Sequence, residues 1–207
     1  MRRIITLIVA TLMVALSNPA FAVSTASVPV RAIVPSGLEL TYWIQSAPPG
    51  VDPYGAGSAA VTSMDFGTLT YDQTNGIYLA GKYFTVFLIG RTAGSAYRLQ
   101  QTCNGFTTTG GSDLNNNLMM TPDYKSQDAV NGIAQGAMPA GDSFTATSLA
   151  FATNKVIYNG NAGVPRIVRA YYGLATGAPG EPAGSAPITD KPAGTYNGTV
   201  TFSVVLQ

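Results

Sequence analysis

The sequence predicts an all-β protein with one main domain, a β-sandwich of immunoglobulin-like general character. Three observations support this fold class. Beyond residue 23, no window keeps apolar residues at helical spacing over three turns, and Gly or Pro interrupts nearly every dozen residues. The last residues of the chain alternate strictly between apolar and polar side chains. Roughly seven to ten segments of strand character are separated by turn signals at the spacing expected of a sandwich.

An export signal is predicted at residues 1–22. Arg2 and Arg3 precede an uncharged apolar run, Ile4 to Leu16, that is short for a membrane span. Ala20-Phe21-Ala22 then fits the small-x-small pattern of a cleavage site, and an uncleaved membrane anchor is the alternative. Cleavage leaves nine basic residues against ten acidic ones, a net charge of −1. Without a basic patch, nucleic acid is not an expected partner.

The first strand of the mature chain lies in residues 23–35, called the front segment below. Its residues alternate, and no strand precedes it as a hairpin partner. Polar or proline residues occupy one side, with Ile33 as the apolar exception. The apolar side consists of Ala26, Val28, Val30, Ala32 and Val34.

Residues 36–207 form the predicted sandwich domain. The segment 82–90 is apolar on both faces, which is typical of a central strand, and 95–103 is expected to form a hairpin with it. The region 104–143 is rich in Gly and Asn, with a short helical turn expected at Ser126–Gly136, and 177–194 is expected to be irregular. Further strands are expected at 37–45, 59–71 (one or two), 144–153, 155–160 and 166–176.

The last strand has the clearest pattern. Thr and other polar side chains occupy one face of residues 195–207, so that face is expected to be wet. The other face is expected to be dry, and its side chains are Tyr196, Gly198, Val200, Phe202, Val204 and Leu206.

No catalytic constellation is found, so the protein is not expected to be an enzyme or to need a cofactor or metal. The chain has no histidine, which removes Ser-His-Asp and Cys-His arrangements and the common zinc sites. Its ten acidic residues lie mostly in turns. Cys103 is the only cysteine, so no internal disulfide forms. It is expected to be a small buried side chain, with an intermolecular disulfide or a reactive thiol as alternatives.

Three stretches carry a resemblance to a known family. The stretch "SVPVRAIVPSGLEL" resembles the start of mature pilins of the colonisation-factor (alternate-chaperone) class of chaperone–usher pili. The ending "DKPAGTYNGTVTFSVVLQ" is similar to the terminal strand of chaperone–usher pilins and of the spore coat U family, and "SMDFGTLTY" resembles their "LDFG" segment. The lack of an internal disulfide agrees with the colonisation-factor class. Pro29 departs from an ideal donor strand because it removes one ladder hydrogen bond.

The resemblance implies an incomplete immunoglobulin-like sandwich that is completed by a donated N-terminal strand. A periplasmic chaperone holds such a subunit until an outer-membrane usher exchanges it for the next subunit, which yields an extracellular filament of identical subunits. The donor residues would be Ala26, Val28, Val30, Ala32 and Val34, and the acceptor groove would be lined by Val200, Phe202, Val204 and Leu206. Each buried valine would contribute about 1.5–3 kcal/mol.

Two other functions remain open on the sequence. One is a surface adhesin or glycan-binding module whose partner is a host or abiotic surface; Trp43 and the tyrosines would stack on sugar rings. The other is a self-contained coat or matrix sandwich in which the front segment pairs inside its own domain.

Overall fold

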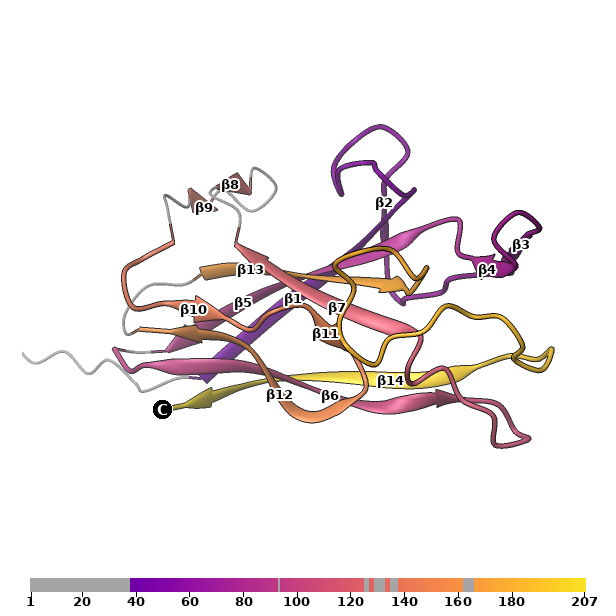
Figure 1. The fold of residues 1–207 in the computed structure, drawn as a ribbon. Helices are drawn as coiled ribbons and strands as arrows, with labels where there is room; N and C mark the ends of the chain where they lie inside the picture. Colours follow the sequence, from indigo (N-terminus) through magenta and orange to yellow (C-terminus); the bar gives the residue numbers. More distant parts are fainter. Residues whose placement is uncertain (1–37, 93, 125–126, 129–132, 135–137, 162–165) are drawn as a thin grey trace, which may run out of the picture. The chain divides into compact units, whose positions relative to one another are not determined.

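Two antiparallel sheets contain most of the described strands of the protein, shown as a computed structural model in Figure 1. The structure describes residues 38–207 except 93, 125–126, 129–132, 135–137 and 162–165. The signal at 1–22 and the front segment, with its five alternating residues, therefore lie outside the described residues. The described part contains no helix long and apolar enough to cross a membrane.

The larger sheet has six strands in the order β11-β7-β13-β5-β1-β2. Their bounds are Leu38–Ala47 (β1), Ala59–Val61 (β2), Tyr83–Thr92 (β5), Leu118–Tyr124 (β7), Ser148–Leu149 (β11) and Arg166–Leu174 (β13). The smaller sheet has the order β10-β12-β6-β14. Its strands are Tyr97–Thr107 (β6), Ser143–Phe144 (β10), Ala152–Gly160 (β12) and Asn197–Leu206 (β14).

Two short hairpins complete the described strands. Thr70–Asp72 (β3) pairs with Ile77–Leu79 (β4), as the "DQTNG" turn between them predicts. Gln127–Asp128 (β8) pairs with Ile133–Ala134 (β9), so these four residues of Ser126–Gly136 are strands where a helical turn was expected, and the rest of that segment lies outside the described residues.

The main core lies between the two sheets and is built by alternate residues of each strand. From β5 and β13, the side chains of Phe84, Val86 and Tyr172 are buried in it, and Tyr97 and Leu99 of β6 face them from the smaller sheet. This arrangement confirms the prediction of an all-β protein over the described residues. It is consistent with a β-sandwich.

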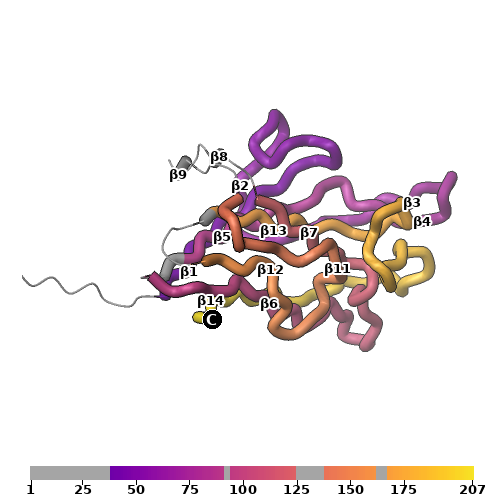
Figure 2. The backbone as a smooth tube through the Cα atoms, turned by 60° about the vertical axis from the view of Figure 1, so that its left-hand side comes forward, coloured from indigo at the N-terminus to yellow at the C-terminus, as the bar shows by residue number. Residues whose placement is uncertain are grey.

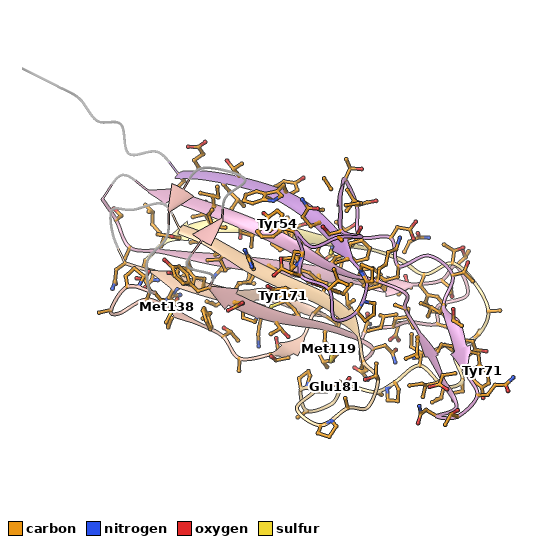
Figure 3. All side chains as sticks on the ribbon, turned by 90° about the horizontal axis from the view of Figure 1, so that it is seen from above. Tyr54, Tyr71, Met119, Met138, Tyr171 and Glu181 are labelled. Atoms are coloured by element: carbon orange, nitrogen blue, oxygen red, sulfur yellow. The ribbon has the colours of Figure 1, made fainter. Side chains whose placement is uncertain are left out.

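A second apolar cluster covers the outer face of the larger sheet. Phe87 of β5 is fully buried there, and the Trp43 indole of β1 stacks on it with ring centroids 4.7 Å apart. Trp43 Nε1 donates to the hydroxyl of Tyr54, which belongs to the β1–β2 connection and overlies the strands in Figure 3. The Arg169 guanidinium lies 5.1 Å from the Phe87 ring centroid. Strand β5 is therefore buried on both faces, which confirms it as a central strand.

The hairpin expected between 82–90 and 95–103 is wrong, because β5 and β6 belong to different sheets. Both strands have one strongly apolar face, and each buries that face in the shared core instead of pairing edge to edge. The two sheets pack closely at Gly90 of β5, where a Cβ would lie 2.7 Å from Cε2 of Tyr97. Glycine at this position leaves room for the Tyr97 ring.

The other expected strands are only partly regular. Segment 59–71 contains β2 and β3 with irregular chain between them, and 144–153 contains only the ends of β10 and β12 and the short β11. Strand β12 has two register shifts, and one of them includes Asn154, whose φ is 50°. Asparagine tolerates this left-handed conformation, and the Asn154 amide donates to Thr102 Oγ1 at 3.0 Å. The expected strand at 166–176 is confirmed as β13.

A buried polar network links the sheets. The Tyr172 hydroxyl donates to Gln101 Oε1, and Gln101 Nε2 donates to the carbonyl oxygen of Ala150 at 2.8 Å. Both side chains are fully buried, and this burial raises the pKa of Tyr172 well above its ordinary value. Tyr172 therefore stays neutral and acts as a hydrogen-bond donor.

Replacing Tyr172→Phe should lower the free energy of unfolding by about 1–3 kcal/mol, because Gln101 Oε1 loses its buried donor. Urea denaturation measures the change. Tyr171→Phe is the matched control, because that side chain lies on the outer, half-buried face of the same strand. Equal losses for the two variants would contradict the importance of the Tyr172–Gln101 bond.

Cys103 is 2% exposed on β6, and burial raises the pKa of its thiol. A raised pKa keeps the thiol protonated at higher pH than usual, so little thiolate is present near pH 8. We expect a thiol reagent such as dithionitrobenzoate to modify the native chain far more slowly than the urea-unfolded chain. Cys103→Ser should leave the chain folded. If the chain assembles as the resemblance of its two ends implies, the serine variant should assemble as well. Rapid modification of the native chain would contradict a buried thiol, and loss of assembly by a folded serine variant would favour a role for the thiol between subunits.

Candidate functional site

Strand β14 forms a long unpaired edge of the smaller sheet. It is outermost in the strand order, and no described strand pairs with its outer side. The outermost strands β2, β10 and β11 of the two sheets contain only two or three residues each, whereas β14 contains ten. Short outermost strands limit edge-to-edge pairing, and a long regular edge invites it.

The inner face of β14 is incompletely covered. On the neighbouring β6, alternate residues from Tyr97 to Cys103 are buried. On β14, Val200, Phe202 and Val204 point to the same core but are only half-buried, and no residue of the strand is buried. The apolar face of β14 therefore points toward the core, as the sequence predicts, but its side chains are not fully buried.

Strand β1 has a corresponding gap in the larger sheet. Strand β2 pairs only with Ile44, Gln45 and Ser46, which leaves the first part of β1 without a described partner on that side. Ile44 is 8% exposed, whereas Tyr42, two residues earlier on the same inward face, is 59% exposed and Leu38 is 50% exposed. Inward-facing apolar side chains are thus exposed where the edge is open.

A groove of about 1140 Å³ lies between these two edges. Its apolar floor comes from both sheets and the loops between them: Phe106, Leu114, Leu118, Leu174 and Ile188. Residues 62–69 form one wall, together with Leu40, Tyr42 and Ile44 of β1. Residues 191–196 and the first part of β14, up to Phe202, form the other wall.

Local contacts fix the irregular parts of these walls. The Phe66 ring packs edge-on against Phe84 of the core, with centroids 4.9 Å apart, which holds the 62–69 segment on the sandwich. Asp65 Oδ1 accepts a hydrogen bond from the amide of Gly67 at 2.8 Å. On the other wall, the Tyr196 hydroxyl donates to the carbonyl oxygen of Pro192 at 2.8 Å. The groove is therefore built by ordered loops as well as by strands.

At one point the groove is crossed by an aromatic contact. The rings of Tyr42 and Phe202 lie on opposite walls with centroids 6.5 Å apart. Phe202 also packs edge-on against Tyr172, with centroids 6.3 Å apart. Beyond Phe202, Val204 and Leu206 are not among the residues that line the groove.

The two strands run in opposite directions. Leu38, at the start of β1, opposes Thr92, and Leu206, at the end of β14, opposes Tyr97, which is close to Thr92 in the sequence. The start of β1 and the end of β14 therefore lie at one end of the domain, which Figure 2 shows in indigo and yellow. The groove opens toward the other end, where β14 begins.

Of the acceptor residues predicted from the sequence, Val200 and Phe202 line the groove. Val204 is half-buried against the core, and Leu206 is 48% exposed. Sequence reasoning missed the opposite wall, which includes Tyr42, Met64 and Phe66. The apolar side chains of "SMDFGTLTY" were a signal for this wall, but its irregular backbone gives no strand periodicity.

The chemistry of the groove suits an extended apolar segment. The outer edge of β14 offers backbone hydrogen-bonding groups, and the apolar floor offers a surface for the side chains on one face of an added strand. Among the described residues, no three His, Cys, Asp or Glu side chains cluster as a metal site. Trp43, the candidate for sugar stacking, is already stacked on Phe87 on the outer face, away from the groove.

Comparison of the chain with protein-family models, curated proteins and solved structures found no match.

Replacing Phe202→Ala should lower the free energy of unfolding by about 2 kcal/mol, less than the roughly 3–5 kcal/mol of a fully buried phenylalanine, because its ring is only half-buried. Urea denaturation of the purified chain measures this. The matched control is Thr201→Ala, an exposed neighbour on the same strand, which should change stability by less than about 0.5 kcal/mol. A loss in the fully buried range would contradict an open groove at Phe202.

Proposed function

We propose that this chain is a structural subunit of an extracellular pilus, assembled when the front segment of one subunit fills the groove of the next. The observation that carries this proposal is the apolar groove between the open edges of β1 and β14. In this proposal the domain is an incomplete immunoglobulin-like sandwich, and the donated strand covers its exposed core by β-strand addition.

The front segment matches the open edge of β14 in length, and its alternating pattern suits an apolar groove. From Ala26 to Val34 it has nine residues, which span about 30 Å when extended and so nearly match the ten residues of β14. Its alternating apolar side chains would enter the groove, while Ser27 and Arg31 would face solvent. Each buried valine would contribute about 1.5–3 kcal/mol, in addition to the ladder hydrogen bonds.

The orientation of a strand in the groove is limited by its two neighbours. Because β1 and β14 run in opposite directions, a strand between them is antiparallel to one and parallel to the other in either orientation. In this proposal the segment of a second copy enters antiparallel to β14, which has ten residues along its open edge, because antiparallel pairing is slightly more stable.

Assembly partners and location follow from the same groove. An exported subunit with an open apolar groove needs cover before it meets the next subunit, which is the task of a periplasmic chaperone. Exchange at an outer-membrane usher would then release the filament to the cell surface. The resemblance of the two chain ends to colonisation-factor pilins supports this route, and the reaction needs neither a cofactor nor catalysis by the chain.

Replacing Val30→Asp should abolish filaments without unfolding the subunit. The carboxylate would enter the groove of the next subunit unpaired, and burial of an unpaired charge is severely penalised. The variant should still be recovered from the periplasm as a folded subunit bound to its chaperone. Filaments are measured by electron microscopy and as SDS-resistant multimers.

Ser27→Asp is the control, because it adds the same carboxylate on the solvent side of the segment. It should assemble normally. If Val30→Asp also gave normal filaments, the front segment would not be the donor, and a self-contained sandwich would become the better description.

A further inference from the structure

We propose that Tyr71 and Tyr78 form a site of oxidative cross-linking, at which a peroxidase-type oxidant that uses hydrogen peroxide joins the two phenol rings by a carbon–carbon bond. The two residues belong to the β3–β4 hairpin, which forms a two-stranded sheet of its own. The inference does not depend on strand donation. It assigns a chemical role to a hairpin that the proposed function leaves without one.

The two rings are already side by side. Tyr71 and Tyr78 are direct partners in the antiparallel hairpin, and their ring centroids lie 5.0 Å apart with the ring planes inclined at 51°. Directly opposed residues of two antiparallel strands share one face of the sheet, with Cβ atoms about 4.5–5.5 Å apart. Rotation of the side chains, rather than movement of the strands, is what brings the ring carbons into contact.

The hairpin that carries the rings is held at its turn and at its base. The carbonyl oxygen of Asp72 accepts a hydrogen bond from the amide of Gly76 at 2.8 Å, and its carboxylate accepts one from Asn75 Nδ2 at 2.7 Å. On the other side, the amide of Tyr78 donates to the carbonyl oxygen of Ile188 at 2.8 Å. The two phenols are therefore preorganised, with an effective concentration on the order of millimolar or higher.

Access to the oxidant distinguishes this pair from the other tyrosines. Tyr71, labelled in Figure 3, is 49% exposed, so an oxidant can reach its ring. The other tyrosine pairs in ring contact among the described residues are wider and have no exposed member: Tyr83–Tyr171 at 6.1 Å, Tyr124–Tyr158 at 6.3 Å and Tyr97–Tyr158 at 6.4 Å. Oxidation that starts at Tyr71 thus has Tyr78 as its nearest phenol partner.

The coupling balances as a two-electron oxidation. Each phenol gives up one electron and one proton and becomes a phenoxyl radical. The two radicals join through ring carbons next to their hydroxyl groups, and the proton on each of these carbons then moves to the oxygen, which restores both phenols. The two electrons and two protons that leave the chain reduce one hydrogen peroxide to two water molecules. The chain loses two hydrogen atoms and gains one carbon–carbon bond.

The bond joins the two strands of a short hairpin beside the groove. Strands β3 and β4 are paired through only three residue pairs, and Tyr78 and Ile188 both line the groove. A covalent link between Tyr71 and Tyr78 holds the hairpin closed at this end of the domain.

Peroxidase treatment of the purified full chain tests the site. At micromolar concentration, with limiting hydrogen peroxide, coupling within one chain should exceed coupling between chains by about a thousandfold in partner concentration. Monomer is separated from multimers, assayed for dityrosine fluorescence and cleaved before aspartate. This cleavage releases residues 65–71, in which Tyr71 is the only tyrosine. In the treated monomer this fragment should be joined to the fragment that begins at Asp72, with the loss of two hydrogen atoms.

Matched variants assign the partner. Tyr78→Phe keeps the ring but removes the phenol, and it should lower dityrosine in the monomer about tenfold or more. Tyr83→Phe removes the next tyrosine of the same fragment and should leave the yield within about twofold of the parent. Dityrosine that appears only in multimers, or that persists in Tyr78→Phe monomers, would overturn the proposal. Neither result bears on strand donation, which Val30→Asp tests separately.

Discussion

The unpaired edge of β14 is the constraint on which the rest of the structure depends. A strand of ten residues carries a row of backbone donors and acceptors on its outer side, and in the described structure no strand pairs with them. Its inner face covers the core on one side only, so Val200 and Phe202 remain half-buried. The groove, its apolar floor and the exposed Tyr42 all lie where no described strand stands between β14 and β1.

The domain keeps its shape at this gap because each strand beside it is fixed to its neighbour within its own sheet. Strand β1 is fixed to β5 by the Trp43–Phe87 stack on the outer face, so its edge stays in place without a partner beside Tyr42. Strand β14 is fixed to β6 along most of its length, and the Tyr172–Gln101 bond supports the core beneath Phe202. The two walls of the groove are therefore preorganised, which lowers the conformational cost of binding an extended segment.

Side-chain periodicity predicted the strands better than their pairing. Alternation located β14 and its inner face, and the doubly apolar segment 82–90 identified the central β5. The Arg-Thr-Ala-Gly turn signal between β5 and β6 predicted one hairpin, but a turn signal does not tell which sheet each strand joins, and periodicity tells only which face of a strand is buried. The wall at 62–69 has no period of two, so Met64 and Phe66 were missed. Val204 and Leu206 share the face of Phe202 but lie outside the groove, since alternation gives the direction of a side chain and not where a cavity ends.

The geometry of the gap also bears on the kind of assembly. In the proposed assembly, a donor strand antiparallel to β14 would lead into the donor's β1 near Asn197 of the acceptor. The acceptor's own front segment would leave from the opposite end of the domain, where its β1 begins. Such a contact would be heterologous, because the two partners would use different surfaces. Such a contact forms a ring only if the rotation between subunits closes. In the proposed assembly only three residues, Pro35 to Gly37, would join the donated strand to β1 of the next domain, so successive domains would lie close together, and without ring closure the series would continue as an open filament.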